Sequence, residues 1–177
     1  DGIVTEVQHQ DSGAVFGSLR ALLEGRGDLL EPYVALGTAA DTNKFAAAHT
    51  AFNADGAVLV VPAGTAVEKP FFIDIQAATN GAVSFPLVTL ATEQSSQASV
   101  VIRYRSDDDV NALVIPNLEL SVADNSKLKL TVVQHWGKAT TSISHLRAVV
   151  GRDGSVHIGE AGLGAALSRL QLRIDLE

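Results

Sequence analysis

The chain has 177 residues, and its 13 basic and 20 acidic side chains give a net charge of −7, while 46% of the residues are hydrophobic. This length and composition predict one globular unit or two small ones, with an extensive core. Because Cys is absent, disulfides, thiolate metal sites and cysteine nucleophiles are excluded for these residues. The acidic balance argues against nucleic acid as a partner.

No run approaches the roughly 18 apolar residues that would cross a bilayer, and the start shows no signal-peptide pattern. We therefore expect a cytoplasmic protein that makes no membrane contact. The sequence contains no Met, so we also expect it to be part of a longer or processed protein whose C-terminal domain lies beyond these residues.

Residues 1–55 are predicted to form a short strand followed by helices. The first helix is expected to end at Gly25 and Gly27, and a second to begin near Asp28 and carry Leu29, Leu30 and Val34. A third is expected from about Thr42 to Asp55. The apolar residues at helical spacing are Val15, Leu19, Leu22 and Leu23 in the first helix, and Phe45, Ala48 and Phe52 in the third.

Residues 56–177 are predicted to form the β core. They contain nine short runs rich in Val, Ile, Leu and Thr, separated by turn sequences such as Asn80-Gly81 and Asp153-Gly154. Crossover helices of βαβ units are not expected, because nothing helical intervenes. The pattern fits either an antiparallel β-sandwich or a solenoid of β coils. The runs are Ala57–Val61, Phe71–Ile75, Val83–Ala91, Ala98–Tyr104, Val110–Val122, Lys127–Trp136, Ser142–Val150, Ser155–Ile158 and Ala166–Ile174.

The run Lys127–Trp136 shows which face of a strand is buried. Side chains alternate between the two faces of a strand, and the apolar set is Leu128, Leu130, Val132 and Trp136. Gln134 shares this inward face. A buried amide costs about 1–3 kcal/mol unless it finds hydrogen-bond partners, so we expect Gln134 to be bonded.

Motifs for catalysis are absent from the sequence: there is no phosphate-binding Gly-rich loop with a following Lys-Ser/Thr, no HExxH and no GxSxG. The candidates for metal binding are His135, His145 and His157, which fall in three successive strands on the face opposite the aliphatic residues. Three imidazoles could bind Zn or Fe if the strand registers align them. The alternative is that they are surface or interface side chains.

Two blocks, KFAAAHTAF at residues 44–52 and VPAGTAVEKP at residues 61–70, resemble the signature of the SufB/SufD family of iron–sulfur cluster assembly proteins. Weaker agreement extends over most of the chain, at Gly13–Phe16, Asn111-Ala112, Ala123–Ser126 and Gln134–Trp136. The order and spacing of these pieces carry the resemblance, because each piece alone is weak.

The resemblance implies a right-handed parallel β-helix core preceded by short N-terminal helices, in a cytosolic, non-enzymatic scaffold. Such a scaffold works with an ABC-type ATPase, SufC, and pairs with its paralogue SufB through the β-helix edge. Residues 151–155 and 165–169, together with the lack of Cys, are closer to the SufD branch. The chain itself would then hold no stable iron–sulfur cluster, and the cluster would belong to the assembled complex.

In the SufB branch, a Gln-x-Trp pattern matched here by Gln134 and Trp136 lines the inside of the β-helix on a proposed sulfur route. These two are the cofactor-site candidates, and the alternative is a bonded core Gln beside a packed Trp. The family's next basic residue falls near Arg147, but alternation places that side chain outward with His145.

Two other classes of function stay open: a carbohydrate-active β-helix protein, and an oligomerising structural module. The first needs paired carboxylates and aromatic platforms, whereas aromatic residues make up 5% of this chain. We further expect a two-fold homodimer in isolation, formed by unguarded edges at Ser142–Val150 and Ser155–Ile158.

Overall fold

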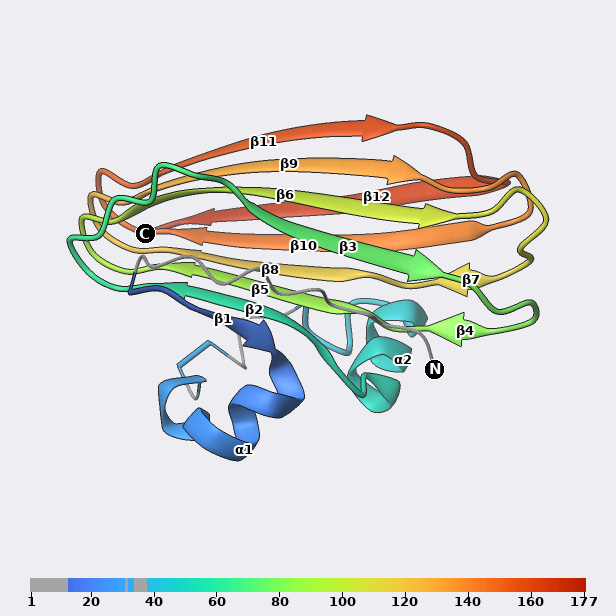
Figure 1. Cartoon of the computed structure of the whole chain (residues 1–177), viewed down its shortest axis with the longest axis horizontal. Helices are drawn as coiled ribbons and strands as arrows, with labels where there is room; N and C mark the ends of the chain where they lie inside the picture. The colour runs from blue at the N-terminus through green and yellow to red at the C-terminus, as the bar shows by residue number, and fades with distance from the viewer. Residues whose placement is uncertain (1–12, 31, 34–37) are drawn as a thin grey trace.

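The computed structural model describes residues 13–30, 32–33 and 38–177. Two helices and twelve strands are assigned in this part of the chain (Figure 1). They are β1 Val15–Ser18, α1 Leu19–Leu30, α2 Lys44–Phe52, β2 Gly56–Val61, β3 Phe71–Ala77, β4 Val83–Ser84, β5 Leu87–Thr92, β6 Gln97–Ser106, β7 Leu113–Val114, β8 Asn117–Val122, β9 Lys127–His135, β10 Thr141–Val150, β11 Ser155–Gly162 and β12 Leu167–Leu176.

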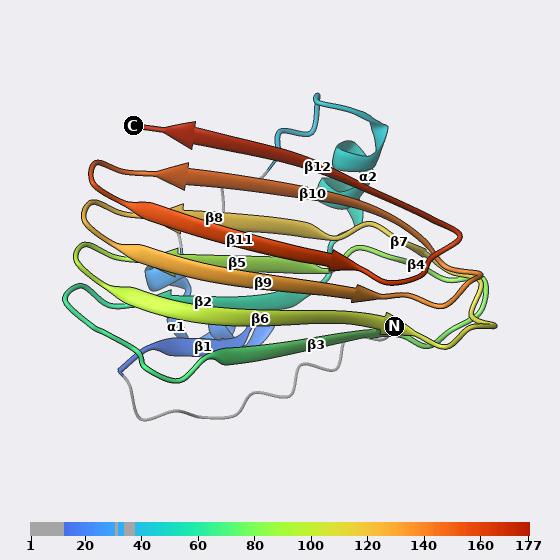
Figure 2. The same ribbon diagram turned by 90° about the horizontal axis from the view of Figure 1, so that it is seen from above.

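The strands wind into about four coils of a parallel β-helix with two sheets. Sheet A contains β1, β2, β5, β8, β10 and β12 side by side, with the short β4 and β7 at one end, and sheet B has the order β11-β9-β6-β3 (Figure 2). Every pairing between the described strands is parallel except that of β1 with β2. The β-helix prediction is confirmed, and the antiparallel sandwich is wrong.

One coil takes about 30 residues. In sheet A, Leu87 pairs with Asn117 and Asn117 with His145, while in sheet B Gln97 pairs with Lys127 and Lys127 with Ser155. Each strand therefore lies directly above the strand of the preceding coil, and residues one coil apart stack on the same face.

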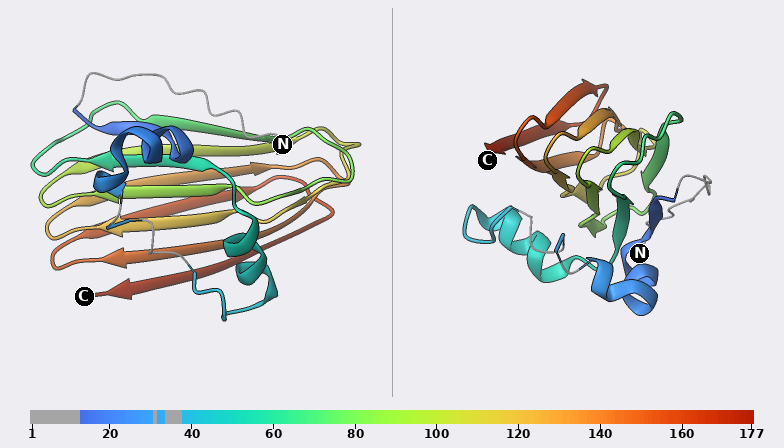
Figure 3. Two further views of the ribbon diagram at one scale, coloured as in Figure 1. Left: turned by 90° about the horizontal axis from the view of Figure 1, so that it is seen from below. Right: turned by 90° about the vertical axis from the view of Figure 1, so that its left-hand side faces the viewer.

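The core lies between the two sheets (Figure 3). Alternate side chains of every central strand point into it, and the inward set predicted for β9 is buried. Tyr104 on β6 and Leu146 on β10 belong to the same cluster. Both helices cover the outer face of sheet A, where α1 contributes Leu19 and Leu30 to a second, smaller cluster.

Two predicted strands are each divided in two. The runs Val83–Ala91 and Val110–Val122 break at Pro86 and Pro116, because proline lacks the N–H that a continuous ladder needs. The two breaks lie one coil apart at the same position in the stack of sheet A. The next strand of this stack, β10, has no proline and is continuous.

The helix predictions need correction. Val15 lies in strand β1 rather than in a helix, and α1 continues through Gly25 and Gly27 to Leu30. Leu29 and Leu30 thus belong to α1 rather than to a separate second helix, and Val34 lies outside the described residues.

α2 begins close to its predicted position. Asn43 forms its N-cap, because the side-chain oxygen accepts hydrogen bonds from the backbone N–H groups of Phe45 and Ala46. At the other end, the Asn53 side chain donates to the Phe85 carbonyl beside the strand break, at 2.8 Å.

One of the two predicted edges is wrong. Ser142–Val150 corresponds to β10, which pairs with β8 on one side and β12 on the other, so its backbone groups are already used. Ser155–Ile158 belongs to β11, which does end sheet B. The described helices are not long and apolar enough for any of them to cross a membrane.

Candidate functional site

Gln134 and Trp136 lie at the C-terminal end of β9 and point into the core, with 3% and 2% of their surface exposed. The inward position predicted for them is confirmed. The following connection folds back against them: Leu163 N–H donates to the Gln134 carbonyl at 2.7 Å, and Ala165 N–H to the Trp136 carbonyl at 3.2 Å. Gly164, at φ +100°, allows this close approach because a Cβ there would collide with the Trp136 carbonyl oxygen.

The Gln134 side chain is bonded at both ends. Its oxygen accepts from the Trp136 indole N–H at 3.0 Å and from the Ser168 hydroxyl at 3.3 Å, and its amide N–H donates to a Glu160 carboxylate oxygen. The indole N–H is only a donor, so the amide orientation is fixed. This network offsets the cost of burying the amide.

Tyr104 completes the cluster. Its ring stacks on that of Trp136 with centroids 5.7 Å apart, and its hydroxyl has no hydrogen-bond partner among the described residues. Burial, and then the charge of Glu160, raises the Tyr104 pKa far above its ordinary value, so the phenol stays neutral. The cluster thus joins an exposed carboxylate to a free buried hydroxyl.

The sequence analysis missed Tyr104 and Ser168 as members of this cluster and gave Glu160 no position in it. Tyr104 pairs directly with Gln134, 30 residues later, and Ser168 pairs with Ser142 of the preceding coil. Glu160 shares the inward face of β11 with Val156 and Ile158. A 30-residue interval would have placed Tyr104 beside Gln134. Glu160 pairs with Val132, two residues before Gln134, and Ser168 reaches Gln134 from the other sheet, so the positions of these two require the actual register.

The three candidate metal-binding histidines do not come together. His135 and His157 are exposed on the outer face of sheet B, in line with Arg105 and Lys129 respectively, whereas His145 lies on the outer face of sheet A. Among the described residues, no group of three His, Cys, Asp or Glu side chains is placed to hold a metal ion.

His145 is buried beneath α2 rather than exposed. The Asn43 oxygen is occupied by the helix cap, so its amide N–H donates to Nε2 of His145 at 3.1 Å, and also to Gln171 at 3.3 Å. Nε2 therefore carries the lone pair and Nδ1 the proton. Burial, and then the charge of Arg169, lowers the His145 pKa, which favours this neutral ring.

Arg147 points outward, as alternation predicts, and donates to Asp175 at 3.0 Å. It is therefore not part of the cluster around Gln134. The buried carboxyl of Glu119 lies beside it on the neighbouring strand.

Glu119 borders a cavity of about 380 Å³ between α2 and sheet A, which Asn117 and His49 also line. Burial raises the Glu119 pKa to about 7, against smaller opposing effects of the Thr89 hydroxyl, 3.5 Å away, and Arg147. Burial likewise lowers the His49 pKa to about 4. At neutral pH the cavity wall therefore holds a neutral imidazole and a carboxyl near its midpoint.

Comparison with known families identifies both parts of the chain. Residues 73–177 match the model described as the SufBD core domain of SUF system FeS cluster assembly. Residues 3–73 match the model of the SufBD protein N-terminal region. A search of curated proteins finds no match to the chain.

Proposed function

Because the chain belongs to the SufB/SufD family and takes part in iron–sulfur cluster assembly by the SUF system, we propose that it is a non-catalytic scaffold subunit of the SufD-like branch. The observation that carries this proposal is the state of the Gln134 cluster. The amide that would line a sulfur route is bonded at both ends to Trp136, Ser168 and Glu160. Such a network supports a packed, structural role for Gln134 and Trp136.

In this proposal the iron–sulfur cluster is cargo, and a partner protein supplies its thiolate ligands. Iron–sulfur clusters are held mainly by Cys thiolates, and none of the 177 residues is Cys. The partners are a SufB-like paralogue and a SufC-like ATPase in the cytoplasm. The last coil supports a paralogue contact, because β11 and β12 each pair with one strand in the described structure and so leave backbone groups available.

Co-expression tests the proposal. An affinity-tagged full-length chain should retain both a SufB-like and a SufC-like protein through gel filtration. Alone, it should show no ATP hydrolysis and no visible absorbance after anaerobic reconstitution with iron and sulfide. A coloured, iron-loaded chain that survives gel filtration by itself would contradict the scaffold role, and so would failure to retain either partner.

In the absence of its paralogue, two copies should associate through the last coil. Leu172 faces the interior side of β12 but is 49% exposed, because no further strand covers it. Leu172→Lys should therefore weaken self-association in sedimentation equilibrium. Val149→Lys is the matched control, since Val149 lies on β10 between two paired strands. A monomeric mass at all micromolar concentrations would refute the homodimer.

A further inference from the structure

The outer face of sheet B is basic, although the chain as a whole is acidic. Both helices cover sheet A, and Figure 3 shows no helix over β3, β6, β9 or β11. Four fixed positive charges and one negative charge point outward from these strands, so four minus one gives +3 on a protein of net charge −7. These are Lys127, Lys129, Arg103, Arg105 and Asp74.

The first group of positive charges lies where the strands begin. Lys127 and Lys129 project from the same face of β9, and His157 lies directly beside Lys129 on β11. They border a surface hollow of about 350 Å³ that Ser99 and Glu68 also line. Among the described residues, neither lysine has an ion pair or a side-chain hydrogen bond. Like charges this close repel one another, and Glu68, which lines the same hollow, forms no ion pair with either lysine in the described structure.

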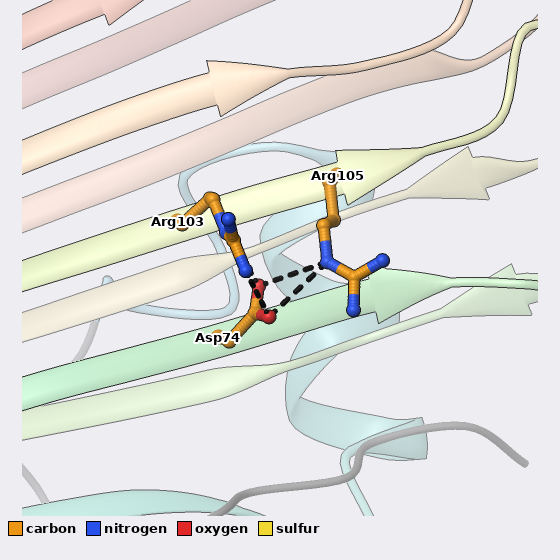
Figure 4. A network of polar contacts seen from close by, with 3 residues as sticks. All are labelled: Asp74, Arg103 and Arg105. Atoms are coloured by element: carbon orange, nitrogen blue, oxygen red, sulfur yellow. Dashed lines mark hydrogen bonds and ion pairs between the residues drawn. The ribbon is translucent and has the colours of Figure 1, made fainter.

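The second group lies where the strands end, around Asp74 (Figure 4). Arg103 binds Asp74 through two nitrogens, at 3.0 and 2.6 Å, and Arg105 donates its Nε–H to the same carboxylate at 3.2 and 3.1 Å. The hydrogen bonds from Arg103 come first among the causes that lower the Asp74 pKa, so Asp74 is ionised. One carboxylate thus serves two guanidinium groups, which leaves a positive charge and the outer nitrogens of Arg105 available.

Apolar surface separates the two groups. Phe72 on β3 is 63% exposed, and its neighbours across the sheet are Val101, Thr131 and Gly159. A Cβ added at Gly159 would meet nothing within 4 Å, so the β11 end of this row is open. An exposed aromatic side chain between charged groups is typical of a binding surface, where aromatic residues and Arg contribute most of the energy.

The distance between the two groups of positive charge indicates what kind of segment could bind to them. Ser99 is in line with Lys129 and lies four residues before Arg103 on β6, which corresponds to about 13 Å along a strand. An extended segment with acidic residues four positions apart, and an apolar residue midway, matches this pattern of charge, apolar row and charge. We propose that the outer face of sheet B binds an acidic, extended segment of a partner protein.

The size of the surface indicates a transient contact. Four strands and the rows between the two charged groups cover roughly 300 Å², which is below the ~800 Å² that each partner buries in a standard stable interface. Electrostatic attraction should dominate such a contact, and it should weaken as salt rises. The proposal is independent of the scaffold role, because it depends only on the charges and exposure of this face.

The test uses the full chain and the peptide acetyl-Asp-Glu-Ser-Leu-Ser-Glu-Asp-amide, with binding followed by backbone amide NMR shifts. Shifts should be confined to β3, β6, β9 and β11, and affinity should fall at least fivefold between 50 and 300 mM NaCl. The same peptide with Asn and Gln in place of the acids should not bind. An absence of shifts at millimolar acidic peptide would overturn the proposal.

Charge reversal tests whether peptide binding depends on the charges of this face or on the total charge of the protein. Lys127→Glu with Lys129→Glu should weaken peptide binding at least tenfold. Lys44→Glu with Arg20→Glu makes the same change of total charge on the two helices that cover sheet A, and it should leave binding within twofold. Equal losses in both double variants would overturn the proposal, as would tighter binding of a ten-nucleotide oligothymidine than of the peptide. Thermal melting of both variants verifies that they are folded.

Discussion

The buried carboxyl of Glu119 makes the stability of the protein depend on pH in a direction that can be measured. Its pKa is raised from 4.5 to about 7 in the folded state. Between these two pH values the carboxyl is protonated in the folded chain but ionised in the unfolded chain. The contribution of Glu119 to the free energy of unfolding is therefore fully present below pH 4.5 and is lost as the pH rises through 7. The shift corresponds to about 3 kcal/mol at most.

Glu119→Gln keeps the side-chain shape and an oxygen for the Thr89 hydroxyl but removes the ionisation. The free energy of unfolding of the variant minus that of wild type should increase by about 2–3 kcal/mol as the pH is raised from 5 to 8. Urea unfolding can follow the fluorescence of Trp136, which is the single tryptophan and lies in the core. Effects of other groups, such as His49, cancel in the difference between variant and wild type.

Glu68→Gln is the matched control, because it makes the same chemical change at an exposed side chain. If the free-energy difference for Glu119→Gln is the same at pH 5 and pH 8, Glu119 is not held in the buried environment described here. A gain at pH 5 that disappears at pH 8 would show that the sign of the shift is wrong.

Three further substitutions, and Gly159→Ala as a control for one of them, test the site and the fold by urea unfolding. Gln134→Leu should cost about 1–3 kcal/mol, because the Trp136 indole N–H loses its acceptor in the core, and an unchanged midpoint would contradict the network. Gly164→Ala should destabilise the protein strongly, because a Cβ at Gly164 is opposed by the φ of +100° and would collide with the Trp136 carbonyl. Gly159→Ala should have little effect, because Gly159 faces open space. Asn43→Ala should cost about 1 kcal/mol or more through loss of the helix cap; a neutral effect would argue against docking of α2 through this residue.

The β core could be predicted largely from local pattern. Alternation in Lys127–Trp136 was sufficient to place Gln134 and Trp136 inward, because a strand with one buried face leaves no other register. The breaks at Pro86 and Pro116 were not predicted, although both prolines lie inside predicted runs and lack the N–H that a continuous ladder needs. Choosing a parallel β-helix over a sandwich depended on the family resemblance, since both use the same short strands.

Long-range packing explains what local pattern could not predict. α1 continues through Gly25 and Gly27, although each glycine costs about 1 kcal/mol in a helix, and burial of Leu19 and Leu30 against sheet A accompanies this continuation. The outward direction of His145 was predicted correctly. Its burial depends on Asn43, 102 residues away, which local pattern cannot reveal.

The contacts of α2 also affect how the molecule comes apart. In a solenoid each coil touches only its neighbours, so the terminal coil can fray without disturbing the rest. Here Asn43 binds Gln171 on β12, 128 residues later, while Asn53 binds Phe85 near the start of the stack. Fraying of β12 must therefore also break the contact between Asn43 and Gln171. The residues that flank α2 thus connect the first coils of the stack to the last. Although α2 is synthesised early, it completes its contacts only after β12 has been synthesised.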